Sequence, residues 1–178
     1  MATRASASMA PERNGGTAVC PGSYDPVTMG HLDIIGRASK VFDNVLVGVV
    51  NQPVRKQQTL FDADERVAFI EAETTELGNV QVKPFDTLLV DFAREHGATA
   101  IVKGLRAISD FEYEFEMNQL NRKMAPEIES VYLMAAPQWS FLSSSGIKEL
   151  AMFGGDISGL VPDRVAARLE EELKRERN

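Results

Sequence analysis

The sequence predicts an α/β fold in which a single domain holds five parallel strands with helices on both faces. Three observations support this class. Apolar runs of strand length alternate along the chain with segments of helical period, as in successive βαβ units. A length of 178 residues fits one domain. With 44% hydrophobic and 25% charged residues, the chain has the composition of a globular protein with a real core.

The five predicted strands are short apolar runs bounded by loop residues. The second, Val45–Val50, is rich in β-branched residues and apolar at both alternating sets of positions, which is typical of a central strand. The third, Val80–Phe85, alternates apolar and polar residues as strands do. In chain order the predicted strands are Thr17–Cys20, Val45–Val50, Val80–Phe85, Thr99–Val102 and Val131–Met134.

The segments between and after these strands predict helices. Leu32, Ile35 and Ala38 fall on one face of the first helix, Asp62 takes an N-cap position ahead of the second, and Pro126 stops the fourth. The predicted helices are Gly30–Phe42, Ala63–Glu76, Leu88–Ala93, Asp110–Met124, Ser145–Phe153 and Pro162–Arg175.

A doubly wound (Rossmann-like) sheet of this kind, here followed by C-terminal helices, binds ligands beyond the carboxyl ends of its strands. In the segment after the first strand, Gly22 and Gly30 permit close approach to the backbone, and His31 falls in the first turn of a helix, where anions are favoured. The segments expected to hold functional residues are 21–31, 51–56, 85–89, 103–106 and 135–145.

Two of the later segments point to the same kind of ligand. Lys103 and Arg106 flank a glycine directly after the fourth predicted strand. Ser143–Ser145 offer hydroxyl and amide donors just before a helix, and Lys148 lies in the predicted first turn of that helix. Because these features share one edge of the sheet, we predict a site for a phosphate-bearing ligand there.

The same residues resemble the signatures of a known family. Gly22–Pro26 with Thr28–His31 resembles the TxGH signature of nucleotidyltransferases, and Ser143–Ser145 resembles the second, serine-rich signature of that superfamily. Their order and spacing resemble the bacterial phosphopantetheine adenylyltransferases, from Thr17 to near the C-terminus. Further segments add to this resemblance: Lys103–Arg106, Asp110–Glu114, Asn121–Arg122 and Trp139–Leu142.

The resemblance implies reversible transfer of an adenylyl group from ATP to 4′-phosphopantetheine, giving dephospho-coenzyme A and pyrophosphate in the penultimate step of coenzyme A biosynthesis. The phosphate of the acceptor would be the nucleophile, so catalysis would consist of aligning two polyanions and stabilising charge at the α-phosphate. Mg²⁺ would accompany ATP, held mostly by phosphate oxygens and water rather than by protein ligands. The resemblance also implies a homohexamer and coenzyme A as a feedback ligand.

The family's site residues carry over position by position. His31 would contact ATP and stabilise the transition state, Ser23 would touch both substrates, Lys103 would bind the phosphate of the acceptor, and Leu89 would line the pantetheine arm. The other ATP contacts would be Tyr24, Gly104, Leu105, Arg106, Glu114, Trp139, Ser140, Phe141, Leu142, Ser143, Ser144 and Ser145.

The chain departs from the family pattern in three places. Tyr24 stands where the family usually has Phe, and Gly146 where it has a larger apolar residue. The segment 51–61 is longer than usual by two or three residues. Its register leaves open whether Arg55 or Lys56 is the second basic residue on the acceptor phosphate.

Charge and cysteine content argue against several other classes. The net charge of −7 disfavours binding of nucleic acid through bulk electrostatics. The single cysteine, Cys20, excludes an internal disulfide and predicts a reducing, cytoplasmic compartment. No apolar run approaches the roughly 20 residues that span a bilayer. Residues 1–16 lack the apolar region of a secretory signal and are expected to be a disordered tail before a nucleotidyltransferase domain at 17–178.

Two alternatives remain open from the sequence. One is a sister enzyme, such as a nicotinamide-mononucleotide adenylyltransferase or a cytidylyltransferase, which shares the TxGH and serine signatures. The segment Lys103–Arg106 followed by Asp110–Glu114 favours the pantetheine branch instead. The other is a catalytically silent nucleotide-binding module, against which the presence of His31 and Ser145 argues.

Overall fold

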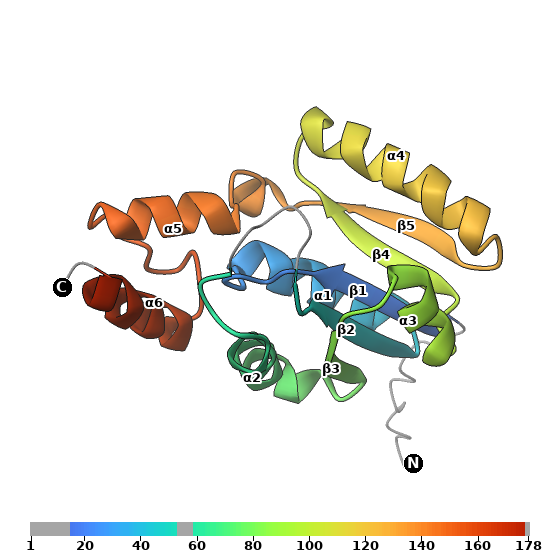
Figure 1. The fold of residues 1–178 in the computed structure, drawn as a ribbon, viewed down its shortest axis with the longest axis horizontal. Helices are drawn as coiled ribbons and strands as arrows, with labels where there is room; N and C mark the ends of the chain where they lie inside the picture. The colour runs from blue at the N-terminus through green and yellow to red at the C-terminus, as the bar shows by residue number, and fades with distance from the viewer. Residues whose placement is uncertain (1–14, 53–58, 177–178) are drawn as a thin grey trace, which may run out of the picture.

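The computed structural model describes residues 15–52 and 59–176 (Figure 1). Five strands form one parallel sheet in the order β3-β2-β1-β4-β5. The predicted α/β class and five-stranded parallel sheet are therefore confirmed. The strands are β1 Thr17–Gly22, β2 Asn44–Val50, β3 Val80–Phe85, β4 Ala100–Leu105 and β5 Glu129–Met134.

Helices cover both faces of this sheet (Figure 1). Alternate residues of β1 separate the core into two clusters, because Ala18 and Cys20 point to one face and Val19 to the other. The first cluster includes Ile35 of α1, and the second includes Phe92 of α3. The helices between strands are α1 Met29–Val41, α2 Ala63–Thr74 with the short 3₁₀ helix η1 Thr75–Leu77, α3 Leu89–Glu95 and α4 Ile108–Met124.

The chain ends in two helices that extend the first cluster beyond the sheet. After the 3₁₀ helix η2 (Pro137–Trp139) come α5 (Ser144–Met152) and α6 (Asp163–Glu176). α6 buries Val165, Leu169 and Leu173, which recur every four residues and so form one apolar stripe. The guanidinium of Arg168 on the same helix lies 2.8 Å from a carboxylate oxygen of Glu65 in α2. Within the described residues, no helix is both long and apolar enough to cross a membrane.

The main difference from the predicted elements concerns β4. The sequence predicts that this strand ends at Val102, with Lys103–Leu105 in the loop, but the strand continues to Leu105. Pairing explains the extension, since Lys103, Gly104 and Leu105 lie in register with Tyr132, Leu133 and Met134 of β5. The prediction of a loop at Lys103 was therefore wrong, and only Arg106 follows the strand.

The first described residues are already attached to the domain. The Gly16 amide donates to Oδ2 of Asp43 at 3.0 Å, and its carbonyl accepts from the Asp43 amide at 3.0 Å. The rest of the predicted tail, residues 1–14, lies outside the described residues.

Candidate functional site

The described parts of the predicted site segments lie towards the carboxyl edge of the sheet. All five strands are parallel, so their last residues lie along the same edge. β1 occupies the centre and pairs with β2 on one side and β4 on the other. The chain leaves β1 towards β2 but leaves β4 towards β5, and doubly wound sheets bind ligands at the place where the direction reverses in this way.

His31 is held at the start of α1 by a reciprocal cap. The Thr28 hydroxyl oxygen accepts from the His31 amide at 3.4 Å, and His31 Nδ1 accepts from the Thr28 amide at 3.0 Å. Because a backbone amide can only donate, Nδ1 carries no hydrogen, and the neutral ring carries its hydrogen on Nε2. The cap therefore makes His31 a hydrogen-bond donor through Nε2 at the positive end of a helix dipole.

Tyr24 supports this histidine from the core. Its ring meets the His31 ring edge to face, with centroids 5.1 Å apart, and its hydroxyl donates to the Cys20 carbonyl at 2.9 Å. Burial of the side chain, with a smaller contribution from Cys20, raises the pKa of Tyr24 well above its usual value. The predicted contact of Tyr24 with ATP stays a prediction, and the hydroxyl group already has a partner in the core.

Lys103 and Glu114, predicted for opposite substrates, lie together. Lys103 Nζ is 3.2 Å from Oε1 and 3.2 Å from Oε2 of Glu114, and both side chains are partly buried. The Tyr132 hydroxyl donates to the Glu114 carbonyl at 3.1 Å. Burial, together with the Glu114 charge, raises the pKa of Tyr132. This cluster holds the lysine of β4 against Glu114 of α4.

Arg106 forms a second ion pair beside the first. Its Nε lies 3.0 Å from Oδ2 of Asp110, and its Nη2 lies 3.2 Å from Oδ1, so the two groups meet side by side. Burial alone would raise the pKa of Asp110, but the hydrogen bonds and charge of Arg106 bring it below its usual value. Nη1 of the same arginine donates to the Leu142 carbonyl. Arg106 therefore joins the end of β4 to the segment that precedes the serines.

The serine segment forms the start of α5 rather than a loop ahead of it. Ser143 is the N-cap, and its hydroxyl oxygen accepts from the Gly146 amide at 3.0 Å. Ser144 is buried and donates to the Pro26 carbonyl at 2.8 Å, while Ser145 is exposed. Trp139 in η2 lies beside the start of α1, since a β-carbon at Gly30 would be 3.4 Å from the Trp139 β-carbon. The TxGH loop and the serine signature are thus neighbours in space.

The remaining predicted residues take different positions. Gly104 packs against α1, and the Leu105 side chain is buried in the core. Leu89 begins α3 and is partly buried. Phe141 is exposed, as is Ser140. The choice between Arg55 and Lys56 falls outside the described residues.

Arg66 is a residue that sequence reasoning missed. Only 1% of it is exposed, and it donates to five backbone carbonyls at 2.7–3.1 Å. One of them belongs to Ser23, one to Val50 at the end of β2, and one to Asn51 directly after that strand. Arg66 thereby ties together the ends of β1 and β2 beneath the site. No local pattern in the sequence indicates this, because all five acceptors are main-chain groups.

The position and the partner of Lys148 differ from those that the sequence predicts. The lysine is the fifth residue of α5, beyond the first turn, and its Nζ lies 2.7 Å from Oδ2 of Asp25. The sequence predicts this lysine in the first turn of the helix, as part of a site for a phosphate-bearing ligand. Its nearest anion is instead a buried carboxylate of the protein.

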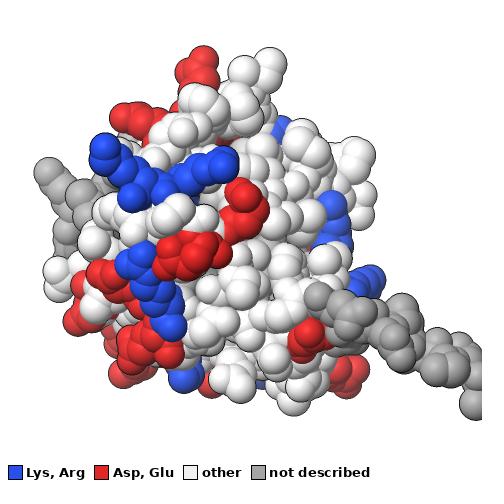
Figure 2. Space-filling view, turned by 90° about the vertical axis from the view of Figure 1, so that its right-hand side faces the viewer, with Lys and Arg blue, Asp and Glu red and all other residues white. Residues whose placement is uncertain are grey.

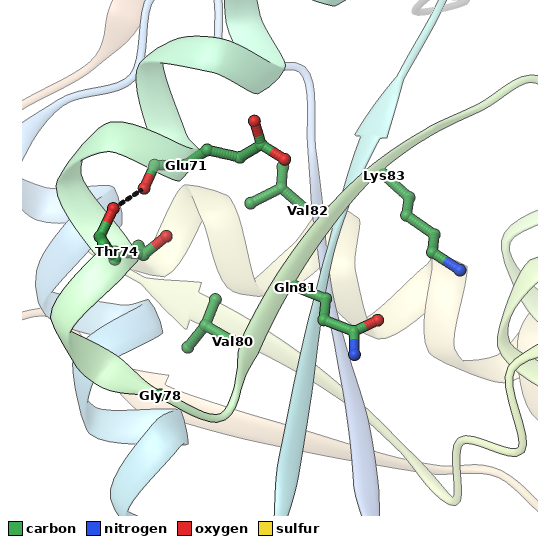
Figure 3. A pocket seen from close by; sticks show the side chains of 8 residues that line it. Glu71, Thr74, Gly78, Val80, Gln81, Val82 and Lys83 are labelled. Atoms are coloured by element: carbon green, nitrogen blue, oxygen red, sulfur yellow. Dashed lines mark hydrogen bonds between the residues drawn. The ribbon is translucent and has the colours of Figure 1, made fainter.

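Among the described residues, no group of three or more His, Cys, Asp or Glu side chains is arranged to hold a metal ion. A pocket of about 470 Å³ lies between α2 and β3, lined by side chains such as Glu71, Val80 and Lys83 (Figure 3). None of the described site residues lines this pocket, and it lies beside the edge strand β3 rather than beside the central strand β1.

Comparisons with known proteins decide the family. The model of the cytidylyltransferase-like family matches residues 19–150, which include both signatures. A phosphopantetheine adenylyltransferase of Rubrobacter xylanophilus is 56% identical over 89% of this chain and 95% of its own length. The chain belongs to the phosphopantetheine adenylyltransferase family. A second member, from Clostridium tetani, is 51% identical over 90% of this chain and 98% of its own.

A solved structure supports the fold independently of this family. A putative nicotinate-nucleotide adenylyltransferase from Vibrio parahaemolyticus superposes with a TM-score of 0.64, covering 91% of this chain and 96% of that one. Its sequence identity of 20% supports the shared fold alone. The sequence comparisons, by contrast, favour the pantetheine branch over the sister enzymes left open by the two signatures.

Proposed function

We propose that this protein transfers an adenylyl group from ATP to 4′-phosphopantetheine, giving dephospho-coenzyme A and pyrophosphate. The observation that carries the proposal is the 56% identity, over nearly the whole chain, to a protein named phosphopantetheine adenylyltransferase. The geometry fits this chemistry, because a donor histidine, two cations and a serine-capped helix start all lie towards the carboxyl edge of one sheet. Each of these groups is suited to phosphate oxygens.

The reaction requires no nucleophile from the protein. An oxygen of the acceptor phosphate attacks the α-phosphorus of ATP, the bond to the bridging oxygen breaks, and pyrophosphate leaves. Negative charge gathers on the non-bridging oxygens of the α-phosphate, and the Nε2 hydrogen of His31 would stabilise it. The protein's task is then to hold two anions against their mutual repulsion and in line.

The cations of the site are positioned before any substrate arrives. Lys103 and Arg106 are held by Glu114 and Asp110 of α4, so their side chains do not have to be ordered during binding. Substrate phosphates would share these cations with the two carboxylates. Lys103 is proposed for the acceptor phosphate and Arg106 for the phosphates of ATP.

Mg²⁺, a homohexamer and feedback by coenzyme A belong to the same proposal. The metal would be held mostly by phosphate oxygens of ATP and by water. When bound, it would neutralise triphosphate charge. Coenzyme A contains the adenosine and pantetheine parts of the product, so the same site would accept it. We propose the cytoplasm as the compartment, in keeping with the single cysteine.

Support for the hexamer comes from α4. This helix exposes apolar side chains that a monomer would leave in water. They are Ile108, Phe111, Phe115, Leu120 and Met124. Nucleic acid is not proposed as a partner, since basic and acidic side chains lie side by side on the face in Figure 2 and the net charge is −7.

The test is release of pyrophosphate from ATP and Mg²⁺ in the presence of different acceptors. We expect release with 4′-phosphopantetheine and none with pantetheine, which lacks both the nucleophile and the anchoring charge. Nicotinamide mononucleotide serves as the acceptor of the sister enzymes. Turnover with that nucleotide and not with phosphopantetheine would overturn the proposal, and absence of turnover with both would favour a silent binding module.

A further inference from the structure

Asp25 is a buried charge that the proposed chemistry does not use. It lies in the loop after β1, between Tyr24 and Pro26, and 0% of it is exposed. Its Oδ1 accepts from the amides of Leu60 and Phe61, each at 3.0 Å. Its Oδ2 lies 2.7 Å from Nζ of Lys148, a residue 123 positions further along the chain. The carboxylate therefore connects three separate segments.

The pairing of this carboxylate is complete enough to keep it charged. Burial alone would raise the pKa of Asp25, but the hydrogen bonds from Lys148, Phe61 and Leu60 bring it below its usual value. A buried ion pair gives little net stability compared with apolar residues of similar size. A role in fixing geometry accounts better for the presence of a charge at this position.

The geometry that this pair fixes is the spacing between the two signatures. Asp25 belongs to the loop that leads from Ser23 to His31, whereas Lys148 lies one turn into the helix that begins with the serines. A second link lies next to the first, because the Ser144 hydroxyl donates to the Pro26 carbonyl at 2.8 Å. Together the two links hold the start of α5 against the TxGH loop.

We propose that Asp25 and Lys148 are positioning residues, which set the distance between the two halves of the nucleotide site. The inference rests on the proposed function, because adenylyl transfer is the reaction that requires this spacing. The pair acts through His31 and the serines, and neither of its members touches the substrate. A shift of about 1 Å between reacting groups lowers turnover by up to about 100-fold.

The experiment compares single and double variants of the pair. Lys148→Met removes the positive charge and keeps a side chain of similar length, whereas Lys148→Arg keeps the charge. Asp25→Asn keeps the shape of the side chain and one oxygen that can accept hydrogen bonds from backbone amides. The double variant combines Asp25→Asn with Lys148→Met. Lys174→Met breaks an exposed lysine–glutamate pair on α6 and serves as the matched control. For each protein we would measure kcat and KM for ATP, the melting temperature, and the Kd for ATP by calorimetry.

We expect Lys148→Met to lower kcat by about 10- to 100-fold while KM for ATP changes by less than about threefold. Lys148→Arg should restore most of kcat, and the control should match the unmodified protein. The double variant should be no slower than the worse single variant, because both changes break one interaction.

Three results would overturn the inference. Unchanged kcat in a folded variant with a lower melting temperature would show a purely structural pair. A loss of kcat in the double variant equal to the product of the two single losses would show that Lys148 acts on the substrate independently of Asp25. Equal activity of the Met and Arg variants would show that the charge is irrelevant.

Failure of the proposed function would look different, because the unmodified protein would then release no pyrophosphate with phosphopantetheine. In that case the positioning role falls together with the proposed function, because it was inferred for adenylyl transfer. An active unmodified protein whose Lys148→Met variant keeps its kcat overturns the positioning role alone.

Discussion

The hydrogen bond from the Thr28 amide to His31 Nδ1 determines which form of the imidazole the site contains. Protonation of Nδ1 would place a hydrogen against the amide hydrogen and would break the cap at the start of α1. The helix dipole opposes a positive charge at the same position. The side chain thus acts as a neutral donor, whose hydrogen is on the nitrogen remote from the cap.

We expect His31→Ala to lower kcat by about 100-fold or more, because it removes a donor that acts on charge developing in the transition state. ATP binding should change far less, since other groups hold the triphosphate. Steady-state kinetics and calorimetry measure the two quantities. His96→Ala is the matched control, as this histidine lies at the end of α3 and bonds to the Phe92 carbonyl. A His31→Ala protein with more than half the normal kcat would contradict the assigned role.

Cys20 gives a second prediction for a single residue. Burial raises the pKa of its thiol from 9.0 to about 12, and the side chain is 2% exposed. At pH 8 the folded protein should hold roughly a thousand times less thiolate than the unfolded chain. Labelling with a disulfide reagent should therefore be slow in buffer and rapid in denaturant. Labelling at comparable rates in both would show that β1 opens readily.

Among the elements, β4 and α1 approach each other closely at Gly104. A β-carbon there would lie 2.9 Å from Cγ1 of Ile34, so Gly104→Ala should cost about 1–3 kcal/mol in the free energy of unfolding. Gly36→Ala is the control, because nothing lies within 4 Å of its added carbon. That change in the middle of α1 should stabilise by about 0.5–1 kcal/mol. Urea denaturation measures both.

The contact itself can be tested by relieving it. The variant that combines Ile34→Ala with Gly104→Ala should lose less free energy of unfolding than the sum of the two single losses. The smaller side chain at position 34 makes room for the new carbon. Strict additivity would show that the glycine is required for another reason.

Sequence periodicity predicted these elements well where the signal is local. The runs of β2 and the helical spacing of α1 depend on neighbouring residues, and both elements appear within one residue of their predicted limits. The end of β4 was wrong, because Lys103 and Gly104 resemble loop residues and only pairing with β5 keeps them extended. The partners of Asp25 and Arg66 were beyond prediction for a similar reason, since long-range topology determines what a buried charge meets.

For the whole molecule, light scattering should give a mass about six times the 19.6 kDa of one chain. The apolar surface of α4 is the expected contact, so Phe115→Glu should yield smaller species. Phe153→Glu, at a residue that is 82% exposed after α5, should leave the mass unchanged. A monomer at every concentration of the unmodified protein would refute the assembly.

The central position of β1 also has a consequence for synthesis on the ribosome. β1 ends at Gly22, but its neighbour β4 begins only at Ala100. At about 5–20 residues per second, roughly 4 to 16 s pass before one edge of the central strand can be paired. During that interval the nascent chain carries the TxGH loop but neither the cations of β4 nor the serines of α5. The ability to bind nucleotide is therefore acquired late in translation. A nascent chain that binds nucleotide has already paired β1 with a strand on each side.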